Sequence, residues 1–462
     1  MVSRATARRT HQGPTGGPGV ATWRRTTLSV NKLGSAPPAV DPSDGKTRVT
    51  AWSFTTLLVL LYIVNWGDKA VLGLAAQPLA KELGLSASQI GLVGSAFFLT
   101  FTLGGFFAGL LDRWMTLKWS LALLAIGWSV AMLPVVVSAT FSVLLVSRML
   151  LGLLEGPSSA LLHTAAYSWH PREKRGVPSA CLTAAASIAK IVIAPALALL
   201  MASYGWRAAF VALALSGLVW LVVWLPTWRP GPHGEDRSPQ AAEDGGPTVP
   251  WVKVITAPTF LGGILAVLGM YALVSVVLTW LPSYFEVGLG YTRVQAGTMF
   301  GFPSIASLVL MFLLTGVSDR LISRGATSRI VRGVVPAVGL LVCGAAMTLL
   351  PMIGTPWVAV AVVSVGYAFG ASIFPLFNAG LAEIVPPRQL AGTLGVFLAV
   401  MSVGGLVGPY VTGLIVDAAA GPAEGYAAAF QVFGVVAIVG AVVALLTVNP
   451  ERDRARLMGT AS

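Results

Sequence analysis

Residues 108–113 read AGLLDR, and the pattern returns 207 positions later as TGVSDR at residues 315–320. Two further echoes follow in the same order. AP at 194–195 returns as GP at 408–409, an offset of 214, and GWRAAF at 205–210 returns as GYAAAF at 425–430, an offset of 220. Three repeats at nearly constant offset predict a chain built from two duplicated halves.

The composition is that of a membrane protein. Hydrophobic residues make up 55% of the 462 residues and charged residues only 10%, with a mean hydropathy of +0.79. A soluble domain carries about a quarter charged residues, so this chain has too few to cover a surface that faces water. Apolar runs of about 20 residues recur, and each can cross a hydrocarbon core about 30 Å thick. We expect twelve spans, near residues 52–75, 88–110, 118–137, 141–166, 177–203, 209–227, 258–282, 296–317, 331–352, 356–381, 390–417 and 426–448.

The basic residues predict the orientation of these spans. With the N-terminus in the cytoplasm, internal loops hold 13 of the 30 Lys and Arg residues and external loops hold three. This positive-inside bias places both termini in the cytoplasm, and we expect a bacterial inner (cytoplasmic) membrane. The net charge of +12 then reflects topology and contact with anionic lipid rather than nucleic-acid binding.

Composition also divides the chain into segments. Residues 228–250 are rich in Pro, Gly and charged residues, which is typical of a cytoplasmic linker. We expect one six-helix bundle at 51–227, a second at 251–448, and a cytoplasmic tail at 449–462. Residues 1–50 have no apolar stretch, so we expect a disordered cytoplasmic tail there or an overextended start site.

With its two six-span halves and an Asp-Arg pair after spans 2 and 8, the sequence resembles the major facilitator superfamily. The resemblance implies an all-α membrane protein of twelve transmembrane helices in two pseudo-symmetric six-helix bundles. It also implies a substrate site between the bundles near the midplane. It assigns the gating loops to Asp112, Arg113, Asp319 and Arg320. This chain departs from the usual loop pattern at residues 115–116, where Met and Thr replace Gly and a basic residue.

Four motifs narrow the resemblance to the anion:cation symporter family. They are NWGDK at 65–69, RMLLGLLEGP at 148–157, PREKRG at 171–176 and WLPSY at 280–284. The family implies uptake of small organic anions, such as sugar acids and aromatic carboxylates, with protons or in some members sodium. Members often have Asn in span 11, whereas residues 390–417 contain none and Ser402 is the main polar residue there.

Five ionisable residues stand clear of the span ends, on spans 1, 4 and 5: Asp68, Lys69, Arg148, Glu155 and Lys190. A charge at the membrane centre is costly, so such residues usually face a cavity and mark function. At about 1.5 Å per residue, an upper layer of Asp68, Lys69 and Arg148 is expected roughly 10 Å below the outer surface. Glu155 and Lys190 are expected in a middle layer.

An anion carrier coupled to protons needs cations for the substrate and a carboxyl group that binds a proton. We therefore expect Asp68 and Glu155 to carry the proton. A substrate anion that competes for a cation would free its carboxylate to take up a proton. The expected substrate contacts are Lys69, Lys190, Asn65, Arg148, Tyr271, Asn378 and Ser402.

Purely structural roles for these charged residues also stay open. The pairs Asp68–Lys69 and Arg148–Glu155 could be structural, and Lys190 could simply pair with Glu155. The carboxylates of Glu383 and Asp417 lie at span ends, where charge costs little, and are set aside.

Other functions also stay open: an efflux or exchange transporter of another solute, or a transporter-like metabolite sensor. We expect a monomer, no cofactor and no enzyme. The sequence has no Gly-Lys-Ser/Thr phosphate loop and no metal-ligand cluster of His and Cys.

Overall fold

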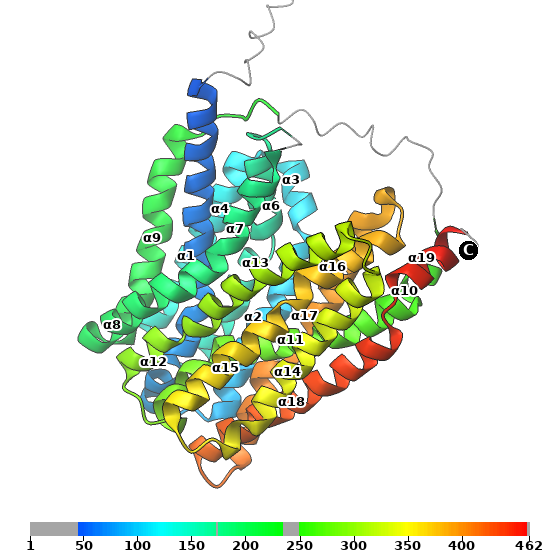
Figure 1. Ribbon diagram of the computed structural model, residues 1–462. Coiled ribbons are helices and arrows are strands. Elements are labelled where there is room, and N and C mark those ends of the chain that lie inside the picture. Colours follow the sequence, from blue (N-terminus) through cyan, green and yellow to red (C-terminus); the bar gives the residue numbers. More distant parts are fainter. Residues whose placement is uncertain (1–44, 172–173, 234–248, 460–462) are drawn as a thin grey trace, which may run out of the picture.

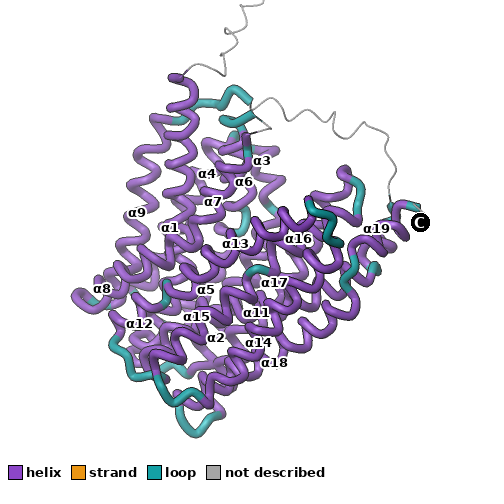
Figure 2. Tube along the Cα trace, in the orientation of Figure 1, coloured by secondary structure: helices purple, strands orange, loops and turns teal. Residues whose placement is uncertain are grey.

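The computed structural model describes residues 45–171, 174–233 and 249–459. Twelve helical segments within these ranges are long and apolar enough to cross a membrane, which confirms the twelve expected spans. No strand occurs in the described ranges, so this part of the protein is all α (Figures 1 and 2).

In the described ranges, the first six spans contain nine α-helices and one π-helical turn. Span 1 is α1 (Gly45–Leu83), and span 2 is α2 (Ala87–Phe106), followed by the short α3 (Ala108–Trp114). Span 3 is α4 (Leu117–Val137), and span 4 is α5 (Phe141–Glu155) with α6 (Ser158–Tyr167). Span 5 joins α7 (Gly176–Ile188), the π-helical turn η2 (Ala189–Ile193) and α8 (Ala194–Tyr204), and span 6 is α9 (Trp206–Thr227).

The second six spans follow the short helix α10 (Trp251–Ile255). Span 7 is α11 (Pro258–Ser283) with the π turn η4 (Tyr284–Gly288), and span 8 is α12 (Arg293–Met299) with α13 (Phe302–Ser323). Span 9 joins η5 (Arg329–Val334), α14 (Val335–Leu349) and η6 (Leu350–Met352), and span 10 is α15 (Pro356–Ala371) with α16 (Ile373–Ile384). Span 11 is α17 (Pro387–Ala418), span 12 is α18 (Pro422–Thr447), and α19 (Pro450–Met458) ends the described chain.

Proline explains two of the breaks that position the site. Span 4 breaks at Gly156-Pro157, between α5 and α6. In span 5, Pro195 is the second residue of α8, which begins directly after η2. Proline has no N–H to donate to the carbonyl four residues earlier, so the preceding turn loses a hydrogen bond and widens.

The ends of the chain differ from the expected segments. Helix α1 begins at Gly45, inside the segment expected as a tail, and α19 lies inside the expected C-terminal tail. Residues 1–44, most of the expected linker and the last three residues lie outside the described ranges.

Spans 1–6 and spans 7–12 form two groups that meet at the end of the molecule away from the start of α1 (Figure 1). There α1 packs against α11, α2 against α17, and α8 against α12. Glycines allow the close approach, since a Cβ on Gly73 would clash with the carbonyl of Leu278 and one on Gly91 with that of Pro409.

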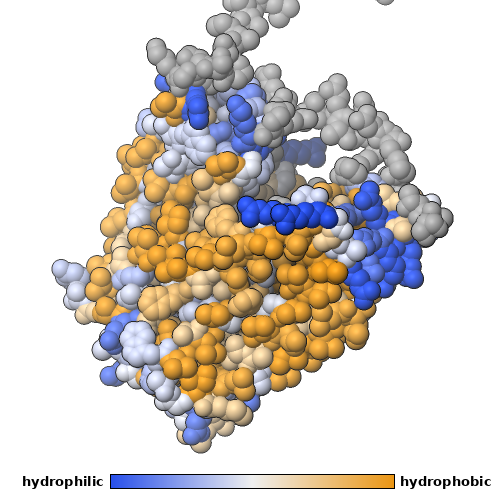
Figure 3. Space-filling model, viewed as in Figure 1, coloured by the Kyte–Doolittle hydropathy of each residue, from blue (hydrophilic) through white to orange (hydrophobic). Residues whose placement is uncertain are grey.

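The surface suits a bilayer. Figure 3 shows hydrophobic residues over the sides of the helices and hydrophilic residues near their ends. Large apolar side chains such as Val222 and Phe312 are well exposed. A soluble protein rarely exposes so broad an apolar surface, so lipid is its natural neighbour.

Candidate functional site

The centre of the first six spans holds a buried ion pair between two helices. Lys69 on α1 donates from Nζ to Glu155 Oε2 on α5 at 2.5 Å and to Asn65 Oδ1 at 2.5 Å. Glu155 Oε1 is buried without a hydrogen-bond partner in the described structure. The pair is therefore only partly satisfied, which leaves an acceptor available for a proton.

Three aromatic rings surround the ammonium group of Lys69. Its Nζ lies 5.1 Å from the ring centroid of Trp66, 5.9 Å from that of Phe97 and 5.1 Å from that of Phe101. Rings at these distances attract a cation through their negative faces. They also exclude water, which strengthens the attraction between the lysine and its carboxylate.

Two glycines, one on α5 and one directly after it, bring these groups together. A Cβ on Gly152 would clash with the carbonyl of Phe97, and one on Gly156 with the carbonyl of Phe101. The two helix backbones are therefore nearly in contact, with no side chain between them. Glu155 follows Gly152 by three residues, so the same close approach sets its carboxylate beside the rings of α2.

Arg148 anchors to α1 in a different way. Its Nη1 donates to the backbone carbonyl of Asp68 at 2.8 Å, and its guanidinium lies 5.3 Å from the ring centroid of Phe210. The buried atoms Arg148 Nη2 and Asp68 Oδ1 have no hydrogen-bond partner in the described structure. The carboxylate of Asp68 is thus buried among cations without forming an ion pair with either.

These contacts change the pairing that the sequence suggested. Lys69 pairs with Glu155, while neither Asp68–Lys69 nor Arg148–Glu155 forms an ion pair within 4.0 Å in the described structure. The two-layer arrangement is also wrong for Lys69, because α1 continues to Leu83. Lys69 therefore lies near the middle of its helix and reaches the expected lower layer.

Lys190 lies on the π-helical turn η2 in the middle of span 5. It is half-buried, and no carboxylate of the described ranges lies within 4.0 Å of its Nζ, so the pairing with Glu155 is wrong. Its Nζ lies 5.9 Å from the ring centroid of Tyr367 on α15. Its backbone carbonyl lies against Gly301, just before α13. This cation thus stands where span 5 meets spans 8 and 10.

The expected contacts in the second half are less polar than the sequence suggested. Tyr271 is half-buried between Phe98 and Phe374, with centroid distances of 6.2 and 6.4 Å. Asn378 is half-buried and makes no hydrogen bond to a described residue. Ser402 donates its hydroxyl to Leu398 O on its own helix at 2.9 Å, which leaves it less available to a ligand.

The expected gating loops stay untested. Arg113 and Arg320 are exposed, and the side chains of Asp112 and Asp319 lie outside the described part of the structure.

The structure also shows a connection between the two halves that the sequence analysis did not predict. It lies at the end of the molecule away from the start of α1. Asp417 at the end of α17 accepts hydrogen bonds from the backbone N–H groups of Ala87 and Ser88, each 2.8 Å long, in the first turn of α2. No sequence pattern indicates this contact, because its partners are 330 and 329 residues apart.

Together, these groups could hold an anion and bind a proton. Lys190 and the partly satisfied Arg148 offer positive charge, and Asp68 and Glu155 each have a buried oxygen without a partner. Among the described residues, no group of three or more His, Cys, Asp and Glu side chains could hold a metal ion.

Comparison with known proteins places these features in a family. The family model described as Major Facilitator Superfamily matches residues 58–379 and 338–459. The chain is 27% identical over 407 residues to a probable galactarate/D-glucarate transporter of Bacillus subtilis, covering 82% of this chain and 88% of that protein. It is also 27% identical over 420 residues to a probable sulfoacetate transporter of Cupriavidus necator, covering 85% of this chain and 93% of that protein.

A solved structure shares the fold. It is described as a bacterial homolog to the human lysosomal transporter Spinster, in an inward-facing and unoccupied conformation. It matches with a TM-score of 0.75 and 18% identity, covering 88% of this chain and 98% of that one.

Proposed function

The chain belongs to the Major Facilitator Superfamily, and on this premise we propose that it is a secondary active transporter that takes up a small organic anion together with a proton. The two groups of spans act as bundles, residues 51–227 and 251–448, joined by a linker at 228–250. They expose the site to each side of the membrane in turn. The protein works as a monomer and needs no cofactor.

The proposal rests chiefly on the position of Lys190. A half-buried cation in the middle of a span, without a carboxylate partner in the described structure, is expensive in a membrane and calls for a ligand. An organic anion would supply the missing negative charge. The named relatives, which are described as transporters of sugar acids and of sulfoacetate, support this class of substrate.

Coupling follows from the pair of Lys69 and Glu155. A proton that binds the free Oε1 of Glu155 neutralises the carboxylate and leaves Lys69 with an uncompensated positive charge, which favours the binding of a substrate anion. Asp68, whose carboxylate has no ion-pair partner, serves as a second proton site. Sodium in place of the proton is an outcome that the coupling experiment distinguishes.

The protein sits in a bacterial inner membrane with both termini in the cytoplasm, as the distribution of basic residues favours. The contacts at the far end of the molecule then close the external side. On this basis the described conformation faces the cytoplasm.

The test is uptake into proteoliposomes driven by a pH gradient, with a panel of carboxylates that includes galactarate and sulfoacetate. We expect at least one acid to accumulate, Lys190→Gln to abolish accumulation, and Lys190→Arg to retain part of it. The matched control is Lys253→Gln, which removes an exposed lysine from α10. If no anion moves, or Lys190→Gln transports normally, the proposal fails and efflux of another solute becomes the better interpretation.

Glu155→Gln separates coupling from binding. This variant keeps the shape of the side chain but cannot release a proton. We expect it to lose uptake driven by the gradient and to keep exchange of labelled for unlabelled substrate. Full gradient-driven uptake by Glu155→Gln would exclude this residue as the proton carrier. Uptake that follows a sodium gradient instead would identify the other coupling ion.

A further inference from the structure

A groove lies on the outer surface of the first six spans, between the start of α1 and the end of α9. Figure 1 shows these two helices side by side, and they pack against each other. The groove has a volume of about 200 Å³ and is lined by Ser53, Phe54 and Leu57 of α1 and by Val223 and Thr227 of α9. Ser53, Val223 and Thr227 are exposed, so the groove opens toward the surroundings of the protein.

Aromatic rings form the buried side of the groove. Phe54 stacks on Trp169 with a centroid distance of 4.5 Å. It also meets Trp224 and Trp228 edge-on, with a centroid distance of 6.2 Å to each. Tryptophan is enriched where the hydrocarbon core of a membrane meets the headgroups. These rings therefore indicate that the groove lies at the level where acyl chains join their headgroups.

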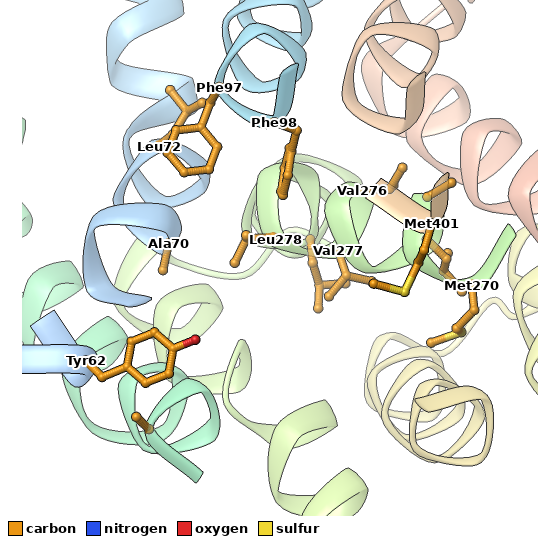
Figure 4. Close-up of a cluster of buried hydrophobic side chains, with 14 of the residues drawn as sticks. Tyr62, Ala70, Leu72, Phe97, Phe98, Met270, Val276, Val277, Leu278 and Met401 are labelled. Atoms are coloured by element: carbon orange, nitrogen blue, oxygen red, sulfur yellow. The ribbon is translucent and has the colours of Figure 1, made fainter. Parts of the chain in front are cut away.

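The start of α1 has a different environment from the middle of the helix. Tyr62, Ala70 and Leu72 are buried inside the protein (Figure 4). In contrast, Ser53 and Thr56 are exposed. The described part of the chain thus leaves this end of α1 open to a ligand from the membrane.

Two arginines lie next to the groove, on the side away from the middle of the membrane. Arg48 lines a second cavity of about 540 Å³ together with Trp52 and Ser53. Ser53 lines both cavities, so the cavities adjoin. Arg48 precedes Ser53 by five residues, which places it about 7 Å further along the helix axis. Arg229 follows Thr227, the last residue of α9, by two residues.

The charges of these two arginines are not used by the described protein. Arg48 and Arg229 are exposed, and neither forms an ion pair with a carboxylate of the described ranges. Two cations above an apolar groove complement an amphiphile with a negative headgroup and an apolar chain. A partner helix fits less well, because packed helices share rows of residues over several turns. This groove covers only about one turn of each helix, from Ser53 to Leu57 and from Val223 to Thr227.

We propose that the groove between α1 and α9 binds a phospholipid with an anionic headgroup, whose phosphate binds Arg48 and Arg229 while one acyl chain enters the groove. The site goes beyond the transport function and uses none of the residues assigned to the substrate or the proton. Its leaflet rests on the orientation proposed above. With the start of α1 in the cytoplasm, the lipid belongs to the inner leaflet, whose surface carries negative charge.

Native mass spectrometry of the purified full chain in detergent tests this binding. The protein is titrated with phosphatidylglycerol and with phosphatidylcholine that carry identical acyl chains, so that only the headgroup differs. A Lys or Arg near an anionic lipid surface contributes about fivefold in affinity, and two contribute about 25-fold at most. We therefore expect the first phosphatidylglycerol to bind about tenfold or more tightly than the first phosphatidylcholine.

Two pairs of substitutions assign the headgroup preference to the site. Arg48→Gln combined with Arg229→Gln should reduce the preference for phosphatidylglycerol to about twofold or less. Arg324→Gln combined with Arg329→Gln is the matched control, because it removes two exposed arginines from the loop between spans 8 and 9. This control should keep the full preference.

A second pair of variants tests the groove itself. Val223→Trp places a large ring in the groove and should lower the affinity for both lipids by about tenfold, because the acyl chain loses apolar contact. Val219→Trp is the matched control on the same helix. Val219 is 64% exposed and lines neither cavity, so this variant should bind both lipids normally.

Equal affinity of the unaltered protein for the two lipids would overturn the proposal, since it would show only a nonspecific shell of lipid. This comparison needs no variant, so a folding defect leaves the test intact. An equal loss of preference in the Arg324 and Arg329 control would overturn the proposal as well. Because lipid binding is measured in detergent without a transported anion, failure of the lipid site leaves the proposed transport standing, and failure of transport leaves the lipid site standing.

Discussion

Replacing Asp417 by Asn should loosen the contact between the two groups of spans at the end away from the start of α1. Asp417 joins span 11 to span 2 through two hydrogen bonds of 2.8 Å to backbone N–H groups in the first turn of α2. These N–H groups have no partner within their own helix, and the positive end of the helix dipole favours a carboxylate there. Asn keeps one acceptor oxygen and loses both the second acceptor and the charge.

The size of the effect follows from these losses. A hydrogen bond to a charged group contributes about 1.5–3 kcal/mol, a neutral one about 1 kcal/mol, and a charge at a helix N-terminus about 0.3–1 kcal/mol. Asp417 is exposed, so the low end of these ranges applies and the net loss is about 1.5 kcal/mol. That corresponds to about a tenfold shift in population from the closed to the open state of this end.

Electron–electron distance measurements can detect the shift. Spin labels at Lys81→Cys on α1 and Ala423→Cys on α18, in a background without the two native cysteines, report the separation of the halves at this end. We expect Asp417→Asn to increase the longer-distance population. Glu424→Gln, which removes an exposed carboxylate that bonds to no described residue, should leave it unchanged. Identical distance distributions for the native protein and Asp417→Asn would refute the reasoning.

Three further predictions concern packing and stability. Lys69→Met should lower the free energy of chemical unfolding by about 3–5 kcal/mol, because it leaves Glu155 buried and unpaired. Adding Glu155→Leu to this variant should restore most of the lost stability. An equal loss of stability in the double variant would contradict the pairing. Gly91→Val should impair transport strongly, because a Cβ at this position would clash with α17. Gly109→Val is the control and should transport normally, because there is open space around Gly109. Similar transport by both variants would show that the close approach of α2 to α17 is unimportant. Burial alone would raise the pKa of Asp453, but hydrogen bonds from the adjacent arginine and the first turn of α11 outweigh it and hold the pKa below its ordinary value. Because the folded pKa is lowered, the stabilisation is present above the ordinary carboxyl pKa of about 3.9 and is lost as pH falls through the lower folded value. Asp453→Asn should therefore unfold more easily than the native protein near neutral pH, with the difference shrinking below about pH 4; a difference independent of pH would argue against this origin.

The spans could be predicted from the sequence because each is a local property. An apolar run long enough to cross the bilayer must be helical, since lipid offers no partner for backbone groups. The end of α1 could not be predicted in the same way. Hydropathy reports where the apolar run ends, while the helix continues through polar residues until Gly84, which has a φ of 62°. The depth assigned to Lys69 was wrong for this reason.

The partners of the charged residues depend on contacts between helices. The carboxylate of Glu155 pairs with Lys69 and not with Arg148, because glycines set the approach of α5 to α2. Asp417 was set aside because a charge at a span end costs little on its own. Its role arises only when span 11 meets the first turn of span 2, and no local pattern carries that information.

The distribution of charge between the halves has a consequence for how a ligand acts. The five ionisable residues in the middle of the spans all belong to spans 1–6, whereas Tyr271 and Tyr367 belong to spans 7–12. If the halves rock against each other, the pair of Lys69 and Glu155 moves as part of one body and keeps its geometry. Lys190 and Tyr367 belong to different bodies and must separate. A ligand that bridges Lys190 and Tyr367 therefore favours conformations in which the halves are close together at this level, whereas a proton on Glu155 acts within one half. Substrate should thus change the distance between the halves, and Glu155→Gln should change the coupling of transport to pH without changing that distance.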